Sequence, residues 1–368
     1  MNNWYEIKNI DFIDSPALII YKERVEENIR VLLSMIDDPA RLRPHVKTHK
    51  TKEVSLMLMQ AGINKFKCAT IAEAEMLAMV GAADVLLAYQ PFGPKLQRFL
   101  LLIQQYPATL FSCLVDNVAS AQNIAKAAIE NKLVIPIYID INAGMNRTGI
   151  TPDSGAVELY ETCASLEGLQ VRGLHVYDGH FRAQYYEQRK RDSDKAFEKV
   201  SELQDGLQQK GFKPTIIAGG SPTFPIHAAR KNVECSPGTF IFWDKGYQTS
   251  CPEQAFVTAA LVISRIISVP EKNILCLDLG HKSIASENEL NKRVYFLNAP
   301  ELKFIGHSEE HLVAQAPDGH SWKAGDVLYG LPYHICPTCA LYERAQVVEN
   351  NVATTEWKII ARDRKITV

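Results

Sequence analysis

The chain has 368 residues, of which 46% are hydrophobic, and its formal net charge is −2 at pH 7. This length exceeds a single hydrophobic core, so we expect one large domain and a smaller one. The charge balance provides no broad basic surface, which argues against nucleic acid as a partner.

Nothing in the sequence indicates a membrane or a secreted protein. No apolar stretch approaches the roughly 20 residues that a membrane-spanning helix needs. Residues 1–12 mix charged and apolar side chains and lack the apolar core of a secretory signal. The eight cysteines stand at irregular spacings, which does not indicate a disulfide framework. We therefore expect a cytoplasmic protein without membrane association.

Strand and helix patterns alternate through the first two thirds of the chain. The strand candidates are short apolar runs: Ala17–Ile20, Arg41–Lys47, Lys65–Ala69, Asp84–Ala88, Ser112–Val115, Val134–Ile141, Leu169–Val176 and Thr215–Ala218. The helix candidates are amphipathic: Lys22–Ile36, Thr51–Ala61, Ile71–Val80, Lys95–Gln105, Val118–Glu130, Gly155–Leu166 and Gln188–Lys210. About eight parallel βα units fit a closed barrel better than an open sheet. We predict an α/β fold with a (β/α)8 TIM-like barrel over residues 13–249.

The pattern changes after Thr249, where no long amphipathic helix is found. Short strand-like runs are separated by Gly, Pro and Asn: Phe256–Pro270, Asn273–Leu279, Arg293–Leu297, His311–Ala314, Asp326–Leu331, Arg344–Val348 and Trp357–Ala361. This spacing is typical of an antiparallel arrangement. We predict a C-terminal antiparallel β-domain over residues 250–368.

Lys47 is the first candidate for chemistry. It ends the predicted strand Arg41–Lys47, and a helical pattern follows it directly. The carboxyl ends of parallel strands are where side chains of an α/β barrel reach a ligand. A partly desolvated lysine there loses its proton more easily and becomes a nucleophile for imine chemistry. The alternative is a solvated basic turn.

The octapeptide Arg-Pro-His-Val-Lys-Thr-His-Lys at 43–50 resembles the cofactor-lysine segment of the D-threonine aldolase and D-serine dehydratase family. Its members are alanine-racemase-like pyridoxal-phosphate enzymes of fold type III. The resemblance continues in order through Lys65–Thr70, Glu73–Glu75, Leu86–Gln90, Gly144–Gly149, His175–His180, Gly219–Thr223, Pro237–Thr239 and His334–Thr338.

The resemblance has several implications. The barrel would be of the alanine-racemase type, and pyridoxal 5'-phosphate would be carried on Lys47, not on Lys50 or Lys52. Residues 1–12 would join the β-domain. The assembly would be a homodimer in which the partner's β-domain completes each site.

Two glycine-bearing turns are candidates for a phosphate site. Ala218–Thr223 combines two glycines with two hydroxyls, and Pro237–Thr239 is a second short turn. Backbone amides at such turns approach an anion closely. Either turn by itself is also typical of an ordinary loop. The resemblance assigns both to the cofactor phosphate, through the residues Gly220, Ser221, Thr223, Gly238 and Thr239. A dinucleotide is not indicated, because no Gly-x-Gly-x-x-Gly joins a strand to a helix.

Arg147 lies in the run Gly-Met-Asn-Arg-Thr-Gly at 144–149, which resembles a signature of the racemase-like enzymes. Its fixed charge would stabilise the phenolate oxygen of the cofactor. A surface ion pair is the alternative. By resemblance, Tyr177 contacts the cofactor.

A metal site is indicated far downstream. If His334-Ile335-Cys336 is a strand, the imidazole and the thiol point to the same face, and both are good zinc ligands. The family binds a divalent metal at this position, so we expect zinc or manganese on His334 and Cys336. Cys339 is not expected to be a third ligand. His307 and His311 have the spacing of a helical metal site, but a solvated turn is the preferred interpretation.

These features predict a pyridoxal-phosphate- and metal-dependent lyase of β-hydroxy-D-amino acids, small molecules that it would cleave by a D-threonine-aldolase-like retro-aldol reaction. Elimination by a D-serine dehydratase needs the same residues and is the first alternative. An amino-acid racemase would use the same barrel and lysine with a second acid-base residue and no metal. A pyridoxal-phosphate homeostasis protein is disfavoured, because that class is usually a barrel alone.

Overall fold

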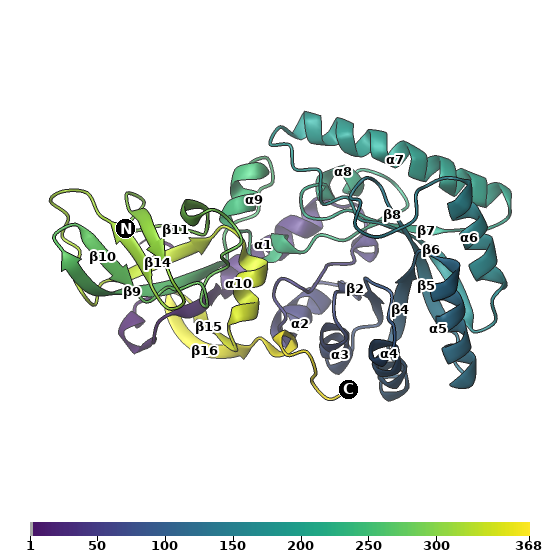
Figure 1. The fold of residues 1–368 in the computed structure, drawn as a ribbon, viewed down its shortest axis with the longest axis horizontal. Helices are drawn as coiled ribbons and strands as arrows, with labels where there is room; N and C mark the ends of the chain where they lie inside the picture. Colours follow the sequence, from purple (N-terminus) through teal and green to yellow (C-terminus); the bar gives the residue numbers. More distant parts are fainter. Residues whose placement is uncertain (1–2) are drawn as a thin grey trace. The chain divides into compact units, whose positions relative to one another are not determined.

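The computed structural model describes residues 3–368, which form two compact units (Figure 1). The barrel unit comprises Leu32–Lys47, Lys52–Gly238 and Asp363–Val368. The sheet unit comprises the chain up to Val31, Thr48–Thr51 and Thr239–Arg362. These units do not follow the predicted bounds of 13–249 and 250–368. Within residues 3–368, no helix is long and apolar enough to span a bilayer.

Seven parallel strands in sequence order form the sheet of the barrel unit. They are β2 (Lys65–Cys68), β3 (Asp84–Leu87), β4 (Leu110–Val115), β5 (Ile135–Ile141), β6 (Leu169–Val176), β7 (Thr215–Ala218) and β8 (Val233–Cys235). Helices follow most of these strands, and α3 to α6 lie along the outer side of the sheet (Figure 1). The α/β fold predicted from the sequence is therefore confirmed.

Residues 42–46 close this sheet into a barrel. Leu42 forms a parallel bridge with Cys235 of β8, and His45 forms one with Lys67 of β2. The Val46 amide donates to the Lys67 carbonyl at 3.0 Å, and the Lys67 amide donates to the Pro44 carbonyl at 2.9 Å. The segment thus takes the eighth place in the ring, although it forms isolated bridges and no regular strand.

Two strand assignments from the sequence are corrected. Ala17–Ile20 was counted among the barrel strands, but β1 (Ala17–Tyr21) pairs with strands of the sheet unit. The barrel uses β8 instead, which the sequence did not predict as a strand. This strand has only three residues and a central Glu234, so it lacks the apolar run that identifies a buried parallel strand.

Helices α3, α5 and α6 of the barrel unit begin at side-chain caps. Thr70 caps α3 by accepting from the Glu73 amide at 3.0 Å, and Asn117 caps α5 by accepting from the Ser120 amide at 2.9 Å. The bounds are α2 (Lys52–Gln60), α3 (Ile71–Met79), α4 (Pro94–Gln105), α5 (Val118–Glu130), α6 (Ser154–Ser165), α7 (Tyr186–Gln209) and α8 (Phe224–Ala228). Their apolar faces are buried against the strands.

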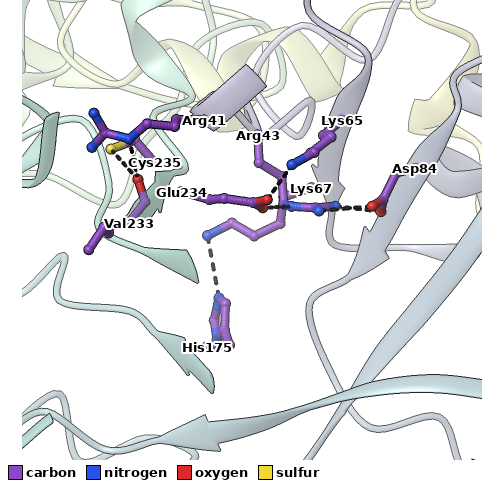
Figure 2. Close-up of polar contacts among 9 residues, drawn as sticks. All are labelled: Arg41, Arg43, Lys65, Lys67, Asp84, His175, Val233, Glu234 and Cys235. Carbon is purple, nitrogen blue, oxygen red and sulfur yellow. Dashed lines mark hydrogen bonds and ion pairs between the residues drawn. The ribbon is translucent and has the colours of Figure 1, made fainter. Parts of the chain in front are cut away.

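The barrel interior is layered. An apolar cluster consists of Leu86, Leu114, Tyr138 and Ile217, from β3, β4, β5 and β7. Because β7 pairs with none of the other three strands, these side chains meet inside the ring. An ionic layer lies at the strand starts, where Arg43 contacts Asp84 and Glu234 and Lys65 also pairs with Glu234 (Figure 2). A second polar layer lies near the strand ends and forms the candidate site described below.

The sheet unit is antiparallel except for one pair, since β1 runs parallel to β15. Its strand order is β12-β13-β10-β9-β1-β15-β16, with β14 paired to β9 and β11 to β14. The strands after β1 are β9 (Ala260–Glu271), β10 (Ile274–Leu277), β11 (Val294–Phe296), β12 (Lys303–His307), β13 (Leu312–Gln315), β14 (Val327–Pro332), β15 (Arg344–Glu349) and β16 (Val352–Lys358). The remaining helices are α1 (Lys22–Ser34), α9 (Lys245–Ser250) and α10 (Ile335–Leu341).

Residues 3–12 pack on this sheet. Ile7 is 4% exposed and belongs to a core cluster with residues of β1, β9 and β14. The Lys8 amide donates to the Asn351 carbonyl at 2.8 Å, and the Asn9 side chain bonds both ways with the Ala353 backbone. The apolar side chains of this segment therefore explain why it joins the sheet unit.

Candidate functional site

Lys47 lies directly after the bridging segment that closes the barrel, at the carboxyl end of the parallel strands. It is half-buried, and its backbone amide donates to Nδ1 of His45 at 3.3 Å. The regular strand expected up to Lys47 is not formed, because the chain turns after the bridge at His45. The lysine nevertheless stands at the end of the ring where ligands of such barrels bind.

Lys67, which the sequence analysis did not single out, is the second lysine of this layer. It comes from β2, is 2% exposed, and its Nζ lies 3.4 Å from Nε2 of His175 (Figure 2). Burial and the positive charge of Lys47 lower the pKa of Lys67 to about 7. The alternation of side chains along a strand could have identified Lys67, because Lys65 and Lys67 are two residues apart and therefore face the same side of β2.

Tyr177 follows β6 and lies near two cations. The Arg147 guanidinium carbon is 5.0 Å from the centroid of the Tyr177 ring, and Lys67 Nζ is 5.7 Å from it. Both distances are within the range of cation–π attraction. The structure thus brings Arg147 and Tyr177 together, although Arg147 is exposed. The positive charge around the ring favours an anionic ligand group at this place.

The first glycine-bearing turn depends on glycine for its shape. Gly219 has φ +81°, and a Cβ there would lie 2.8 Å from the His227 ring. A Cβ on Gly220 would lie 3.3 Å from the Tyr177 ring. The Gly220 amide donates to Thr223 Oγ1 at 3.3 Å. A bulkier chain at these positions would fill the space beside Tyr177.

A buried carboxylate, Asp178, holds this turn in place. Thr223 Oγ1 donates to one of its oxygens at 2.6 Å, and His227 Nε2 lies 2.7 Å from the other. Burial opposes the charge on Asp178, but its contacts with His227 and Thr223 lower its pKa. The hydroxyl of Thr223 therefore donates its proton to Asp178 and not to a ligand. This network joins Asp178, Thr223 and His227, whose contacts could not be predicted from their positions in the sequence.

The second turn meets the first one. The Gly238 amide donates to Ser221 Oγ at 3.3 Å, so the two predicted phosphate turns are neighbours. Ser236, one residue before Pro237, is 3% exposed, and its Oγ has no hydrogen-bond partner among residues 3–368. A buried hydroxyl without a partner is costly unless a ligand satisfies it. This group of donors fits an anion such as a phosphate.

Thr239 was predicted to share this phosphate site, but it belongs to the sheet unit. Its Oγ1 lies 3.4 Å from Sγ of Cys336, and a 3-10 turn over Thr239–Ile241 begins at this residue. The structure therefore places the Thr239 hydroxyl with the candidate metal residues of the sheet unit.

His334 and Cys336 lie at the start of a helix, which corrects the strand expected there. His334 is the N-cap of α10, and Cys336 lies in its first turn. Pro337 explains the helix, because proline fits the first turn, where amides have no helical partner. Thr338 Oγ1 also donates to the His334 carbonyl at 2.8 Å. The two side chains still contact each other through a hydrogen bond.

Carboxylates surround the His334 imidazole. Its Nδ1 lies 2.5 Å from Oε1 of Glu287. Burial lowers the pKa of His334, but its contacts with Cys336, Glu287 and Asp244 outweigh burial and raise the value to about 9. Asp244 is 2% exposed and accepts from the Tyr247 amide at 2.9 Å and from the Ile335 amide at 3.0 Å. It thereby caps α9 and fixes the start of α10.

The donor set suits a soft divalent metal, with one imidazole and one thiol in contact. No cluster of three or more His, Cys, Asp or Glu side chains in residues 3–368 has the arrangement of a complete metal site. Cys339 is fully buried, and burial raises its pKa. His307 ends β12, where its Nε2 lies 3.0 Å from the Leu279 carbonyl, and it faces Arg293.

Comparisons with known proteins agree with this architecture. Residues 20–245 match the model of the alanine racemase N-terminal domain, and residues 259–348 match a putative serine dehydratase domain. D-threonine aldolase of Arthrobacter sp. is 27% identical over 95% of this chain and 93% of its own. The 3-hydroxy-D-aspartate aldolase of Paracoccus denitrificans (strain Pd 1222) is 26% identical over 96% and 93%.

Among solved structures, D-threonine aldolase of Filomicrobium marinum is similar, with a TM-score of 0.89. It is 24% identical, and the alignment covers 98% of this chain and 99% of that one. This likeness establishes the shared fold. Because the alanine racemase N-terminal domain model spans more than half of the chain, the protein belongs to the alanine-racemase-like family that this domain defines.

Proposed function

We propose that the protein is a lyase of β-hydroxy-D-amino acids that uses pyridoxal 5'-phosphate and a divalent metal and cleaves its substrate in a retro-aldol reaction. One observation carries the proposal: the chain holds a candidate cofactor lysine at the end of its barrel and a contacting His334–Cys336 pair in its sheet unit. The names of the aldolase relatives support the substrate class.

The barrel residues fit the cofactor. Lys47 would hold it covalently, and Ser221, Gly238 and the partnerless hydroxyl of Ser236 would hold its phosphate. Arg147 would neutralise its phenolate oxygen beside Tyr177. When bound, the cofactor supplies an electron sink for the bond that breaks at Cα of the substrate. The free amine of Lys47 can then accept or return a proton at that carbon.

The sheet unit fits the metal. His334 and Cys336 would bind zinc or manganese, and Glu287 would orient the imidazole through its contact with Nδ1. The metal supplies a Lewis acid for the β-hydroxyl of the substrate. Thr239 and Thr48 border the thiol, with their hydroxyls 3.4 and 3.0 Å from Sγ. These two hydroxyls would orient the Cys336 thiol. For Thr239, this role replaces the contact with the cofactor phosphate that the sequence analysis predicts.

D-serine dehydratase activity is the second candidate. The match of residues 259–348 to a putative serine dehydratase domain favours it. Elimination would use the same residues, with Lys47 removing the α-proton and the metal assisting departure of the hydroxide. A homodimer in the cytoplasm completes the proposal; the dimer stays a prediction from the resemblance, and the location stays a prediction from the sequence composition.

A substrate assay tests the proposal. Purified protein with pyridoxal phosphate and Mn²⁺ or Zn²⁺ is given D-threonine or D-serine, with the L-enantiomers as controls. The aldolase releases acetaldehyde and glycine from D-threonine. Keto acid and ammonia from D-serine as the main products would select the dehydratase instead. Interconversion of alanine enantiomers without either product would contradict both and favour a racemase.

A further inference from the structure

Lys67 is a buried cation that the proposed function leaves without a role. It is 2% exposed, and within residues 3–368 its hydrogen-bond partner is the Nε2 atom of His175, at 3.4 Å (Figure 2). In the described part of the chain, no carboxylate forms an ion pair with the ammonium. Burying a charge away from an anionic partner is costly, so a lysine kept in this position calls for an explanation.

The hydrogen-bond directions define how Lys67 is held. An ammonium only donates, so Nε2 of His175 must accept. The proton of the neutral imidazole is then on Nδ1, which donates to Oδ1 of Asp140 at 2.7 Å. Burial and the nearby charge of Lys67 lower the pKa of His175, which agrees with a neutral ring. Asp140 and His175 therefore form a rigid support that aims the amine of Lys67.

Both positive and negative groups act on Lys67, and burial has the largest effect on its pKa. Burial and Lys47 lower its pKa to about 7, so the amine is only partly protonated at neutral pH. The charged and titratable groups that act on it from the neighbouring elements are Lys47, Arg43, Asp140, Asp178 and His175. An anion that arrives next to the amine would favour its charged form.

We propose that Lys67 is a ligand-binding residue of the barrel interior, whose ammonium binds an anionic oxygen of the cofactor or of the substrate and gains its proton when that anion binds. The position supports this role, because Lys67 and Arg147 both border the Tyr177 ring. The inference rests on the proposed cofactor site. It adds proton uptake coupled to binding, which a purely structural lysine would not produce.

The test measures protons taken up on binding, with a pH electrode in weakly buffered solution. Pyridoxal phosphate is added to the cofactor-free full chain at pH 7 and pH 8, and acetate is added separately to the cofactor-loaded protein as a probe for a substrate carboxylate. Wild type is compared with Lys67→Met and Lys67→Arg. The arginine keeps a charge that is present at both pH values, so it can bind the anion without gaining a proton.

From a pKa of about 7, wild type should take up about half a proton more than either variant at pH 7 and nearly one at pH 8. Lys65→Met is the matched control, because Lys65 lies two residues earlier on the same strand and pairs with Glu234. It should behave as wild type. If wild type takes up more protons than the variants when pyridoxal phosphate is added, Lys67 binds an oxygen of the cofactor. If it does so when acetate is added, Lys67 binds a carboxylate oxygen of the substrate.

Equal proton uptake by wild type and both variants in the two experiments would overturn the inference while leaving the cofactor site intact. A wild-type protein that acquires no visible absorption with pyridoxal phosphate would refute the proposed function, and the role of Lys67 with it. If Lys67→Met fails to fold, the comparison with Lys67→Arg still decides, since that variant keeps the buried charge.

Discussion

Arg43 donates two hydrogen bonds to the carboxylate of Asp84, at 2.6 and 3.0 Å, from a side chain that is only 1% exposed. It also donates to Glu234 at 2.8 Å, and Lys65 pairs with the same carboxylate, so two cations balance two carboxylates inside the barrel (Figure 2). Removing one partner of such a buried group leaves uncompensated charge. Through Asp84 and Glu234, Arg43 thus links β3 and β8 to residues 42–46, which close the ring.

The first prediction concerns this ionic layer. Arg43→Met should lower the free energy of unfolding by about 3–5 kcal/mol, because Asp84 would stay buried without its cation and Glu234 would be left with its pairing to Lys65. Lys65→Met, which removes the more exposed partner of Glu234, should cost less than about 1 kcal/mol. Urea denaturation of both variants measures the difference. Equal losses would contradict the central role of Arg43.

The second prediction is a pH dependence of stability. The pKa of Lys67 falls from 10.5 to about 7 on folding, so between these values the unfolded chain binds more protons and stability rises with pH. Below pH 7 both states are protonated, and the burial penalty is fully present. The free energy of unfolding of Lys67→Met should therefore exceed that of wild type most at pH 6. This difference should shrink by about 2 kcal/mol between pH 7 and pH 9.

Denaturation curves at several pH values test this dependence. A difference between the two proteins that stays constant with pH would mean that Lys67 is protonated throughout. Lys65→Met provides the matched curve, since it removes a lysine of the same strand.

The third prediction identifies the cofactor lysine. Borohydride should attach pyridoxal phosphate covalently to Lys47, and Lys47→Ala should abolish turnover because the reacting amine is lost. Peptide mapping of the reduced protein locates the label. Lys50→Ala and Lys52→Ala are the matched controls and should keep the label and the activity. A label on either of these lysines would refute the assignment.

The fourth prediction concerns the two phosphate turns. Ser221→Ala should weaken cofactor binding by about 1.5–3 kcal/mol, the value of a hydrogen bond to a charged group. Gly238→Val should weaken it further, because a side chain would block the approach of the backbone. Equilibrium titration with pyridoxal phosphate gives both affinities. Ser201→Ala, on helix α7, should not change them. Unchanged affinity in both turn variants would mean that the phosphate binds elsewhere.

The fifth prediction separates the metal from the cofactor. His334→Ala and Cys336→Ala should lose bound metal and cleavage at the β-hydroxyl, while the visible absorption of the bound cofactor persists. Metal analysis of the purified proteins and the D-threonine assay provide the two measurements. Cys339→Ala should keep the metal, since its thiol is fully buried. Added metal should restore chelator-treated wild type but not the double variant. Full lyase activity in metal-free protein would end the proposal of a catalytic metal.

Local patterns determined much of this protein in advance. Helices α2 to α7 begin and end within two residues of their predicted bounds, because capping residues and apolar periodicity act over a few neighbouring positions, whereas the short helix α8 was not predicted. The glycine-bearing turns were found for the same reason, and Ser221 and Gly238 do contact each other. The contact between His334 and Cys336 was anticipated as a strand neighbourhood, but the two residues begin helix α10, and Pro337 in its first turn is compatible with that helix. Their role as metal ligands stays a prediction.

The sequence by itself determined the barrel class, the position of Lys47 and the residue types of both candidate sites. Only the tertiary structure decided that β1 belongs to the sheet unit and that β8 completes the barrel instead. It also decided that Lys67, His175 and Asp140 form a chain of hydrogen bonds inside the barrel. These outcomes depend on contacts between residues far apart in the chain. Parallel barrel strands are buried on both faces, so their composition does not reveal which side chains meet in the centre; register and ring closure decide that.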